Sequence, residues 1–386
     1  LRLDVWLYGY MLPVEARFVN PEFSRLGALL SCAEFIRGGV TCFADMYYFE
    51  NEVAWAAVQA GLRAVCGETL MKVPTPDATS YDESLTFCQG FLAQWQGHEL
   101  ITAVPAPHSA YMCTADILSE AVRLSQQYDV PLQIHIAETK LDVQDSIEEK
   151  DMTPVRWLEH VGLFDAKVIA AHCVHVNNED MHILGSHNVG AIHNPTSNLK
   201  LASGFAPVVQ MREHNVNVGL GTDGSASNND LDLWVEMHIA ALLPKALNED
   251  PTALPARDAL ALATIEGARA IHQDHLIGSL EAGKRADLIV VDANRVHTMP
   301  RFDTTGQNVY SRLVYGTKSS DVCHVMVNGR VLLRDGALLT VDEEALLEEA
   351  QELSKKISTF FVARERDLLN KLLAIGGLDQ QETFEV

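Results

Sequence analysis

Seven apolar, strand-like segments alternate with helix-like segments up to Asp223, and this alternation restricts the fold more than any other feature. It is typical of a parallel β/α barrel, an α/β fold whose functional groups lie at the carboxyl ends of the strands. A closed (β/α)8 TIM barrel has eight strands, so we expect a barrel that lacks its first strand. The segments are Gly39–Met46, Arg63–Leu70, Ile101–His108, Pro131–Glu138, Lys167–Val174, Val189–Pro195 and Val216–Asp223.

The sequence pattern changes after residue 277. Gly278–Asp292 and Cys323–Gly336 combine β-branched residues with tight turns, which is typical of antiparallel strands. The segment after residue 340 is rich in Glu, Leu, Lys and Ala and predicts an amphipathic helix, followed by a loose tail. We therefore expect a barrel over residues 1–277, an incomplete small β-sandwich over 278–340, and a C-terminal helix and tail over 341–386.

Two prolines indicate helix boundaries near the end of the predicted barrel. Pro244 is expected to end a helix over Leu231–Leu243, because proline cannot donate a backbone hydrogen bond. Pro255 suits the first turn of a second helix, predicted over Pro255–Ile271.

Composition limits the classes of function. A formal net charge of -23 argues against binding to a nucleic-acid backbone, which needs clustered Lys and Arg. Seven scattered cysteines without a C-x-x-C pair predict a reduced, cytoplasmic protein. No apolar stretch approaches the ~20 residues of a membrane helix, and the first residues do not read as a signal peptide. The sequence begins without Met, from which we expect that the native N-terminus is absent.

The ends of the fourth and fifth predicted strands carry candidate functional residues. His135 and Glu138 form a His-x-x-Glu pair, and a turn after Ile136 is needed to bring both into one cavity. His172 lies at the next strand end, with His175 close behind. Histidine is a common transition-metal ligand and a carboxylate is a natural proton carrier, although a buried histidine bonded to the backbone is the alternative for each one.

The last predicted strand ends in Gly-Thr-Asp-Gly, which places Asp223 between small residues. An acidic group at this position suits a metal ligand that also accepts a proton from water. Helix capping is the alternative for Asp223, and it is the favoured interpretation for Ser227, Asn228 and Asn229. Two histidines and an aspartate at three strand ends of one barrel are stronger evidence together than any one of them.

These motifs resemble the amidohydrolase superfamily, and within it the 5′-methylthioadenosine/S-adenosylhomocysteine deaminases. The similarity extends from about Leu1 to Val341. It implies a metallo-dependent hydrolase barrel and an aminohydrolase that acts on the C–N bond of a cyclic amidine. The residues that carry it are 107–111 (PHSAY), 135–139 (HIAET), 171–175 (AHCVH), 193–204 (HNPTSNLKLASG), 221–224 (GTDG) and 278–288 (GSLEAGKRADL).

The resemblance also implies roles for individual residues. His135 and Asp223 are expected to bind one divalent metal, with Zn²⁺ preferred and Fe, Mn or Ni open. Glu138 is expected to contact the purine ring and carry protons, and His172 to orient the attacking water. Two further substrate contacts are implied, by His108 with the purine and by Glu15 with the ribose hydroxyls. The family precedent also favours a homo-oligomer acting on a small-molecule aminopurine.

Two positions depart from the family pattern. No His-x-His pair, which supplies two metal ligands in the family, occurs in these 386 residues. Glu68 matches a position where arginine binds the carboxylate of S-adenosylhomocysteine, so a neutral substrate such as methylthioadenosine or adenosine is expected. A guanine-type deaminase and an aminotriazine or chloro-aryl hydrolase remain alternatives, as does a catalytically inactive barrel that serves as an interaction subunit.

Overall fold

A computed structural model describes residues 6–301 and 308–376. Residues 1–341 form one unit and residues 342–386 a second, and each is described by itself. This division does not test the predicted domain boundary at residue 277, which stays a prediction. The predicted loose tail beyond Gly376 lies outside the described residues.

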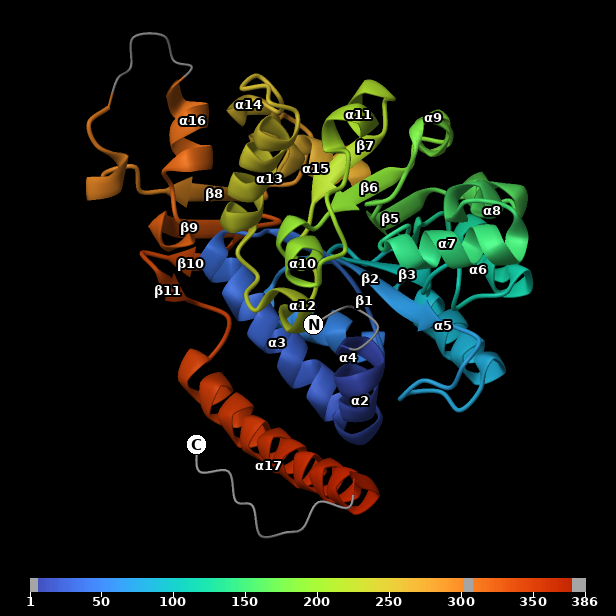
Figure 1. Ribbon diagram of the computed structural model, residues 1–386. Helices are drawn as coiled ribbons and strands as arrows, with labels where there is room; N and C mark the ends of the chain where they lie inside the picture. Colours follow the sequence, from blue (N-terminus) through green and yellow to red (C-terminus); the bar gives the residue numbers. More distant parts are fainter. Residues whose placement is uncertain (1–5, 302–307, 377–386) are drawn as a thin grey trace. The chain divides into compact units, whose positions relative to one another are not determined.

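Seven parallel strands in the described part of the chain form two sheets, in the orders β1-β2-β3 and β4-β5-β6-β7 (Figure 1). The sheets continue into one another where Ser109 pairs with His135 and where the His135 amide donates to the His108 carbonyl at 3.0 Å. The strands are β1 (Cys42–Tyr47), β2 (Arg63–Leu70), β3 (Ile101–Pro107), β4 (Leu132–Ile136), β5 (Val168–His172), β6 (Gly190–His193) and β7 (Asn217–Leu220).

Helices follow these strands as the alternating pattern predicts. Polar side chains cap several of them: Ser80, Thr114 and Thr153 each accept a backbone hydrogen bond at a helix start. The helices are α2 (Leu12–Phe18), α3 (Pro21–Gly38), α4 (Glu50–Ala60), α5 (Tyr81–Trp95), α6 (Ala115–Tyr128), α7 (Lys140–Lys150), α8 (Pro154–His160), α9 (Asn178–Ser186), α10 (Pro195–Lys200), α11 (Val208–Glu213), α12 (Ser225–Asn228), α13 (Leu233–Leu247), α14 (Ala256–Leu262), α15 (Ile265–Ala270) and α16 (Asn308–Tyr315).

Short single turns complete the helical structure of this unit. A π-helical turn spans Leu7–Met11, and 3₁₀ turns span Leu163–Asp165, Val296–Thr298 and Ser319–Asp321.

The proline-based boundaries were wrong. Pro244 lies inside α13, which continues to Leu247, and the Pro244 carbonyl accepts from the amide of Asn248. Pro255 is the residue before α14 rather than part of its first turn. The second predicted helix is also interrupted at Ala263 and Thr264, which separate α14 from α15.

The core of the first unit surrounds the strands. All eight residues of β2 are buried, and the adjacent face of α4 is built from small residues that let the helix approach the sheet closely. β4 and β5 add buried branched side chains to the same core. This packing fixes the positions of the strand ends, and the candidate residues lie at those ends.

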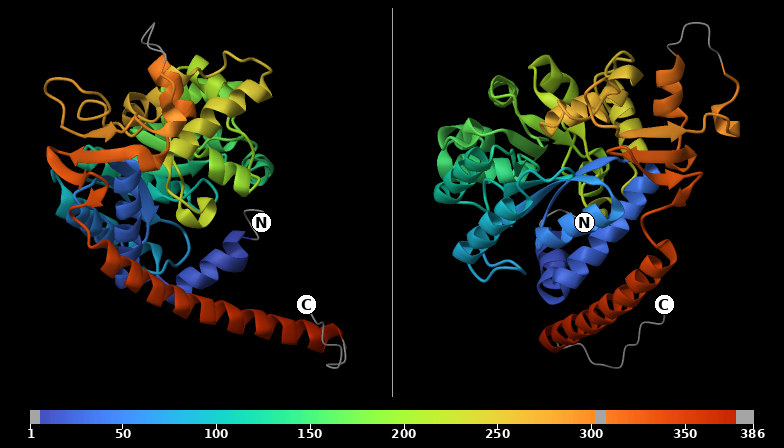
Figure 2. Two further views of the ribbon diagram at one scale, coloured as in Figure 1. Left: turned by 90° about the vertical axis from the view of Figure 1, so that its left-hand side faces the viewer. Right: turned by 180° about the vertical axis from the view of Figure 1, so that it is seen from behind.

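An antiparallel sheet, in the order β11-β10-β9-β8, lies beside α3 in two of the views (Figures 1 and 2). Arg63 joins it to the parallel strands: the guanidinium contacts the Asp287 carboxylate at 2.8 Å, and both side chains are nearly inaccessible. Asp287 also accepts from the Asn328 amide. The strands are β8 (Leu288–Val291), β9 (Val322–Val327), β10 (Arg330–Arg334) and β11 (Ala337–Leu338).

The second unit consists of one helix in its described part, α17 (Glu343–Gly376). A helix is expected here from the composition, and it is continuous over 34 residues. None of the helices in the described part of the chain combines the length and the apolar character that a membrane span requires.

Candidate active site

Four consecutive strands end at a histidine. His108 follows β3, His135 lies in β4, and His172 and His193 are the last residues of β5 and β6. The rings of His108 and His135 have centroids 4.8 Å apart, and those of His135 and His172 are 5.6 Å apart. The imidazoles therefore cluster at the carboxyl ends of the strands, which is the face where β/α barrels carry their active sites.

Glu138 joins this cluster through a sharp backbone turn. Ala137 adopts a left-handed conformation with φ of 50°, which provides the turn after Ile136 that the sequence requires. Glu138 Oε2 lies 3.7 Å from His172 Nε2. Glu138 is 8% exposed, so the carboxylate faces the histidine from a largely water-free position.

Asp223 approaches the same histidine from beyond the end of β7. Ser197 Oγ donates to Asp223 Oδ2 at 2.5 Å, and the Gly224 amide donates to Oδ1 at 2.7 Å. Burial alone raises the pKa of Asp223, but the charge of His172 and these hydrogen bonds lower it below its ordinary value. Asp223 is therefore held as a carboxylate.

The histidines differ in protonation because their surroundings differ. Burial lowers the pKa of His172, but the carboxylates of Glu138 and Asp223 outweigh burial and raise it above its ordinary value. Burial, followed by repulsion from neighbouring imidazoles, lowers the pKa of His108 to about 3 and that of His193 to about 4. The pKa of His135 is lowered for the same reasons. His172 is therefore set apart from the other three histidines by a pKa that is raised rather than lowered.

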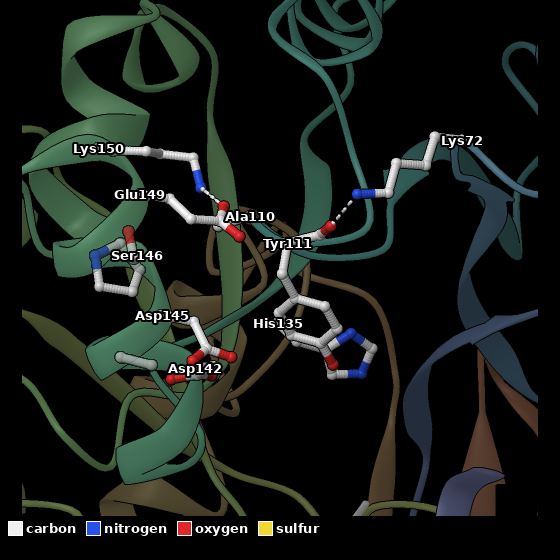
Figure 3. Close-up of a pocket in the computed structure, with 11 residues that line it drawn as sticks. Lys72, Ala110, Tyr111, His135, Asp142, Asp145, Ser146, Glu149 and Lys150 are labelled. Carbon is white, nitrogen blue, oxygen red and sulfur yellow. Dashed lines mark hydrogen bonds and ion pairs between the residues drawn. The ribbon is translucent and has the colours of Figure 1, made fainter.

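A pocket opens beside His135 (Figure 3). Tyr111 and Lys72 line one side, and the Lys72 amine donates to the Tyr111 carbonyl at 2.8 Å. Helix α7 lines the other side with Asp142 and Asp145. This pocket therefore lies against the strand end that carries His135.

Glu15 lies on α2 and is 9% exposed, so it is not a surface residue. Its Oε1 accepts a hydrogen bond from the Tyr47 hydroxyl at 3.1 Å, at the end of β1. Burial raises the pKa of Glu15, and the Tyr47 bond partly opposes that shift. A ribose contact by Glu15 stays a prediction.

Glu68 is buried at the end of β2, where its Oε2 accepts from the Glu50 amide at 3.2 Å. Burial, then the nearby Asp77, raises the pKa of Glu68 well above its ordinary value. A buried carboxyl that favours its neutral form repels a substrate carboxylate much less than an ionised one does. The expectation that Glu68 repels S-adenosylhomocysteine through its charge therefore loses its physical basis.

Sequence reasoning missed four residues of the site: His193, Ser197, Asn198 and Ser203. Asn198 Oδ1 accepts from His172 Nδ1 at 2.9 Å, and Ser203 Oγ donates to Glu138 Oε1 at 3.3 Å. All four lie in the segment 193–204 that carries part of the family resemblance, but the segment by itself does not indicate which side chains they contact. Asn228 is not a helix cap: its amide donates to the Thr222 carbonyl and to Glu236, while Asp232 caps α13.

His135 and Asp223 do not complete a metal site by themselves. Across residues 6–301 and 308–376, no three His, Cys, Asp or Glu side chains are arranged to hold a metal ion. A catalytic zinc site needs three protein ligands and one open position. The ligand set in the described residues is thus too small to fit the metal that the resemblance implies.

Comparison with known proteins decides the family. The sequence model of the amidohydrolase family matches residues 1–332. The chain belongs to the amidohydrolase family. This amidohydrolase is 41% identical over 352 residues to the 5-methylthioadenosine/S-adenosylhomocysteine deaminase 1 of Syntrophus aciditrophicus, covering 91% of this chain and 78% of that protein. The family and these relatives indicate a hydrolase that acts on C–N bonds.

Two further relatives are similar over most of the chain. The 5'-deoxyadenosine deaminase of Methanothermobacter thermautotrophicus is 38% identical over 93% of this amidohydrolase and 82% of that protein. A crystal structure of an adenosine deaminase from Xanthomonas campestris with bound zinc superposes with a TM-score of 0.89 at 37% identity, covering 93% of this chain and 81% of the other. The expected TIM-barrel amidohydrolase fold with a small sheet domain is confirmed.

Proposed function

We propose that this amidohydrolase removes the 6-amino group of an aminopurine nucleoside of the 5′-methylthioadenosine or adenosine type, releasing ammonia. The observation that carries the proposal is the placement of His172 between two carboxylates. Glu138 Oε2 lies 3.7 Å from His172 Nε2, and the charge of His172 lowers the pKa of Asp223. Relatives named for deamination of four adenine nucleosides support the substrate class.

Each of these groups suits one part of the reaction. Glu138 is proposed to deliver a proton to the purine ring nitrogen, which makes C6 a better electrophile. Asp223, held ionised, is proposed to accept a proton from the attacking water as its oxygen bonds to C6, and His172 to orient that water. Passing that proton on to the amino group then lets the C6–N bond break, so that the nitrogen leaves as ammonia. Each such proton transfer contributes roughly 10²–10⁴-fold to a rate.

A divalent metal, most simply zinc, belongs to the proposal because a similar solved structure contains zinc. When bound, such an ion would lower the pKa of a coordinated water to about 7. His135 and Asp223 are the residues proposed to contribute ligands. The described residues do not supply a full set of metal ligands, so the roles above are assigned to side chains alone.

His108 and Glu15 are proposed to contact the purine and the ribose. His108 suits a purine contact because its pKa of about 3 keeps the imidazole neutral, so it can donate or accept a hydrogen bond. Glu15 has one carboxylate oxygen bonded to Tyr47, which leaves the other for a sugar hydroxyl. A cytoplasmic location fits the seven free cysteines, and a homo-oligomer stays a prediction.

Ammonia release tests the proposal directly. The purified protein, supplied with Zn²⁺, is incubated with methylthioadenosine, 5′-deoxyadenosine, adenosine, S-adenosylhomocysteine, guanine and atrazine, with Glu138→Gln as the control variant. We expect turnover of the first four, which are all adenine nucleosides, and a loss of about 10²–10⁴-fold in the variant. Preference for guanine or atrazine supports the related-hydrolase alternatives, and no turnover of any compound supports the inactive barrel.

A further inference from the structure

One short segment contacts all three groups to which the proton transfers and the orientation of water are assigned. Residues 194–204 follow β6 and include α10. Ser197 Oγ bonds Asp223, Asn198 Oδ1 bonds His172, and Ser203 Oγ bonds Glu138, at 2.5, 2.9 and 3.3 Å. Because the three partners come from the ends of β7, β5 and β4, a single segment sets the positions of groups on three strands.

The segment is itself held from within and from outside. The Asn198 carbonyl accepts from the Ser203 amide at 2.8 Å, which closes the turn after α10. His175 Nε2 donates to the Ser203 carbonyl at 2.6 Å. Glu236, which is fully buried, accepts from the Thr196 amide at 3.0 Å. These bonds leave the segment little freedom to shift relative to the strand ends.

We propose that Ser197, Asn198 and Ser203 are positioning residues that fix Asp223, His172 and Glu138 for the reaction, an inference that rests on the proposed deaminase function. Their exposed fractions are 0%, 1% and 6%, so water does not compete for these bonds. Losing an outer partner of a ligand or catalytic group typically costs about 10–100-fold in affinity or activity.

Asn198 has a second role, in selecting the tautomer of His172. Because its carbonyl oxygen faces Nδ1, the proton of a neutral His172 is held at Nδ1, and Nε2 keeps a lone pair on the side of Glu138. The amide nitrogen of Asn198 is buried and has no protein hydrogen-bond partner in the described residues. The bond to His172 is therefore the interaction that Asn198 contributes through its side chain.

Steady-state kinetics separate positioning from folding. Ser197→Ala, Asn198→Leu and Ser203→Ala are expected to lower kcat about 10–100-fold with KM changed less than about 3-fold. Asn198→Asp, which keeps the accepting oxygen, is expected to retain most of the kcat lost in Asn198→Leu. The matched control is Ser125→Ala, since Ser125 is also buried and bonds the Val130 carbonyl, but on α6. Equal kcat losses in Ser125→Ala and Ser197→Ala overturn the proposal.

Nitrogen NMR provides a test that does not need turnover. In ¹⁵N-histidine-labelled protein, His172 is expected to show protonated Nδ1 in the wild type and in Asn198→Asp, and to lose that pattern in Asn198→Leu. An unchanged His172 pattern in Asn198→Leu overturns the role of Asn198. If no substrate is turned over but the His172 pattern depends on Asn198, the deaminase function fails and the positioning role stands.

Discussion

The side chain of Gln133 on β4 donates to the main-chain carbonyl of Asp45 on β1 at 2.8 Å. These strands are not neighbours in either sheet, so the bond spans the inside of the curved wall that the seven strands form. Gly67 of β2 lies between them: a Cβ atom there would be 2.7 Å from Gln133 Nε2 and 3.0 Å from the Asp45 carbonyl. The glycine therefore leaves the space that this bond occupies.

Gly67→Ala is expected to destabilise the protein by about 1–3 kcal/mol, because the added methyl group overpacks a buried strand. The urea midpoint measures the change. Gly90→Ala is the matched control: Gly90 lies in α5 with nothing within 4 Å of a Cβ, so alanine there is expected to stabilise by about 0.5–1 kcal/mol. Equal midpoints for the two variants would refute the steric argument.

Arg63→Met is expected to cost about 3–5 kcal/mol, because it leaves the Asp287 carboxylate buried without its cation. Chemical denaturation followed by circular dichroism gives the measurement. Lys167→Met removes the cation of an exposed pair with Asp129 and is expected to leave the midpoint nearly unchanged. A small effect of Arg63→Met would show that the buried pair is dispensable.

Asp223→Asn is expected to reduce ammonia release by at least about 10²-fold with an unchanged circular dichroism spectrum, because the amide cannot accept a proton from water. Asp180→Asn is the control, since Asp180 is also buried but closes a capping box at the start of α9. It is expected to change stability and leave kcat as in the wild type. Near-normal turnover by Asp223→Asn would contradict its assigned role.

Stability is expected to fall in acid because of His193. Its pKa is about 4 in the folded protein and about 6.5 when unfolded, so the unfolded state binds a proton first as the pH falls. The stabilisation is complete above pH 6.5 and declines toward pH 4, by about 3 kcal/mol for this group. The difference between the urea midpoints at pH 7.5 and pH 4.5 should be smaller in His193→Gln than in the wild type. The same loss in both proteins would exclude His193 as the source.

The strands and their chemical ends could be predicted because each one is a local pattern, an apolar run closed by a polar residue. The supports of the site could not. Ser197 and Asn198 contact residues 26 positions away, and no local pattern specifies such partners. His172 and Asp223 both have positive φ without being glycine, so the usual sequence signal of a tight turn is missing at these strand ends. Pro244 misled because its missing amide is tolerated inside α13.

The contact between Arg63 and Asp287 joins residues 224 positions apart. During synthesis, the ribosome adds residues at about 5–20 per second, so Arg63 emerges at least about ten seconds before its partner exists. Throughout that interval the Arg63 guanidinium on β2 has no Asp287 carboxylate beside which it can be buried. The buried pair can therefore form only after the antiparallel strands have been synthesised, which makes their docking against β2 a late step in folding.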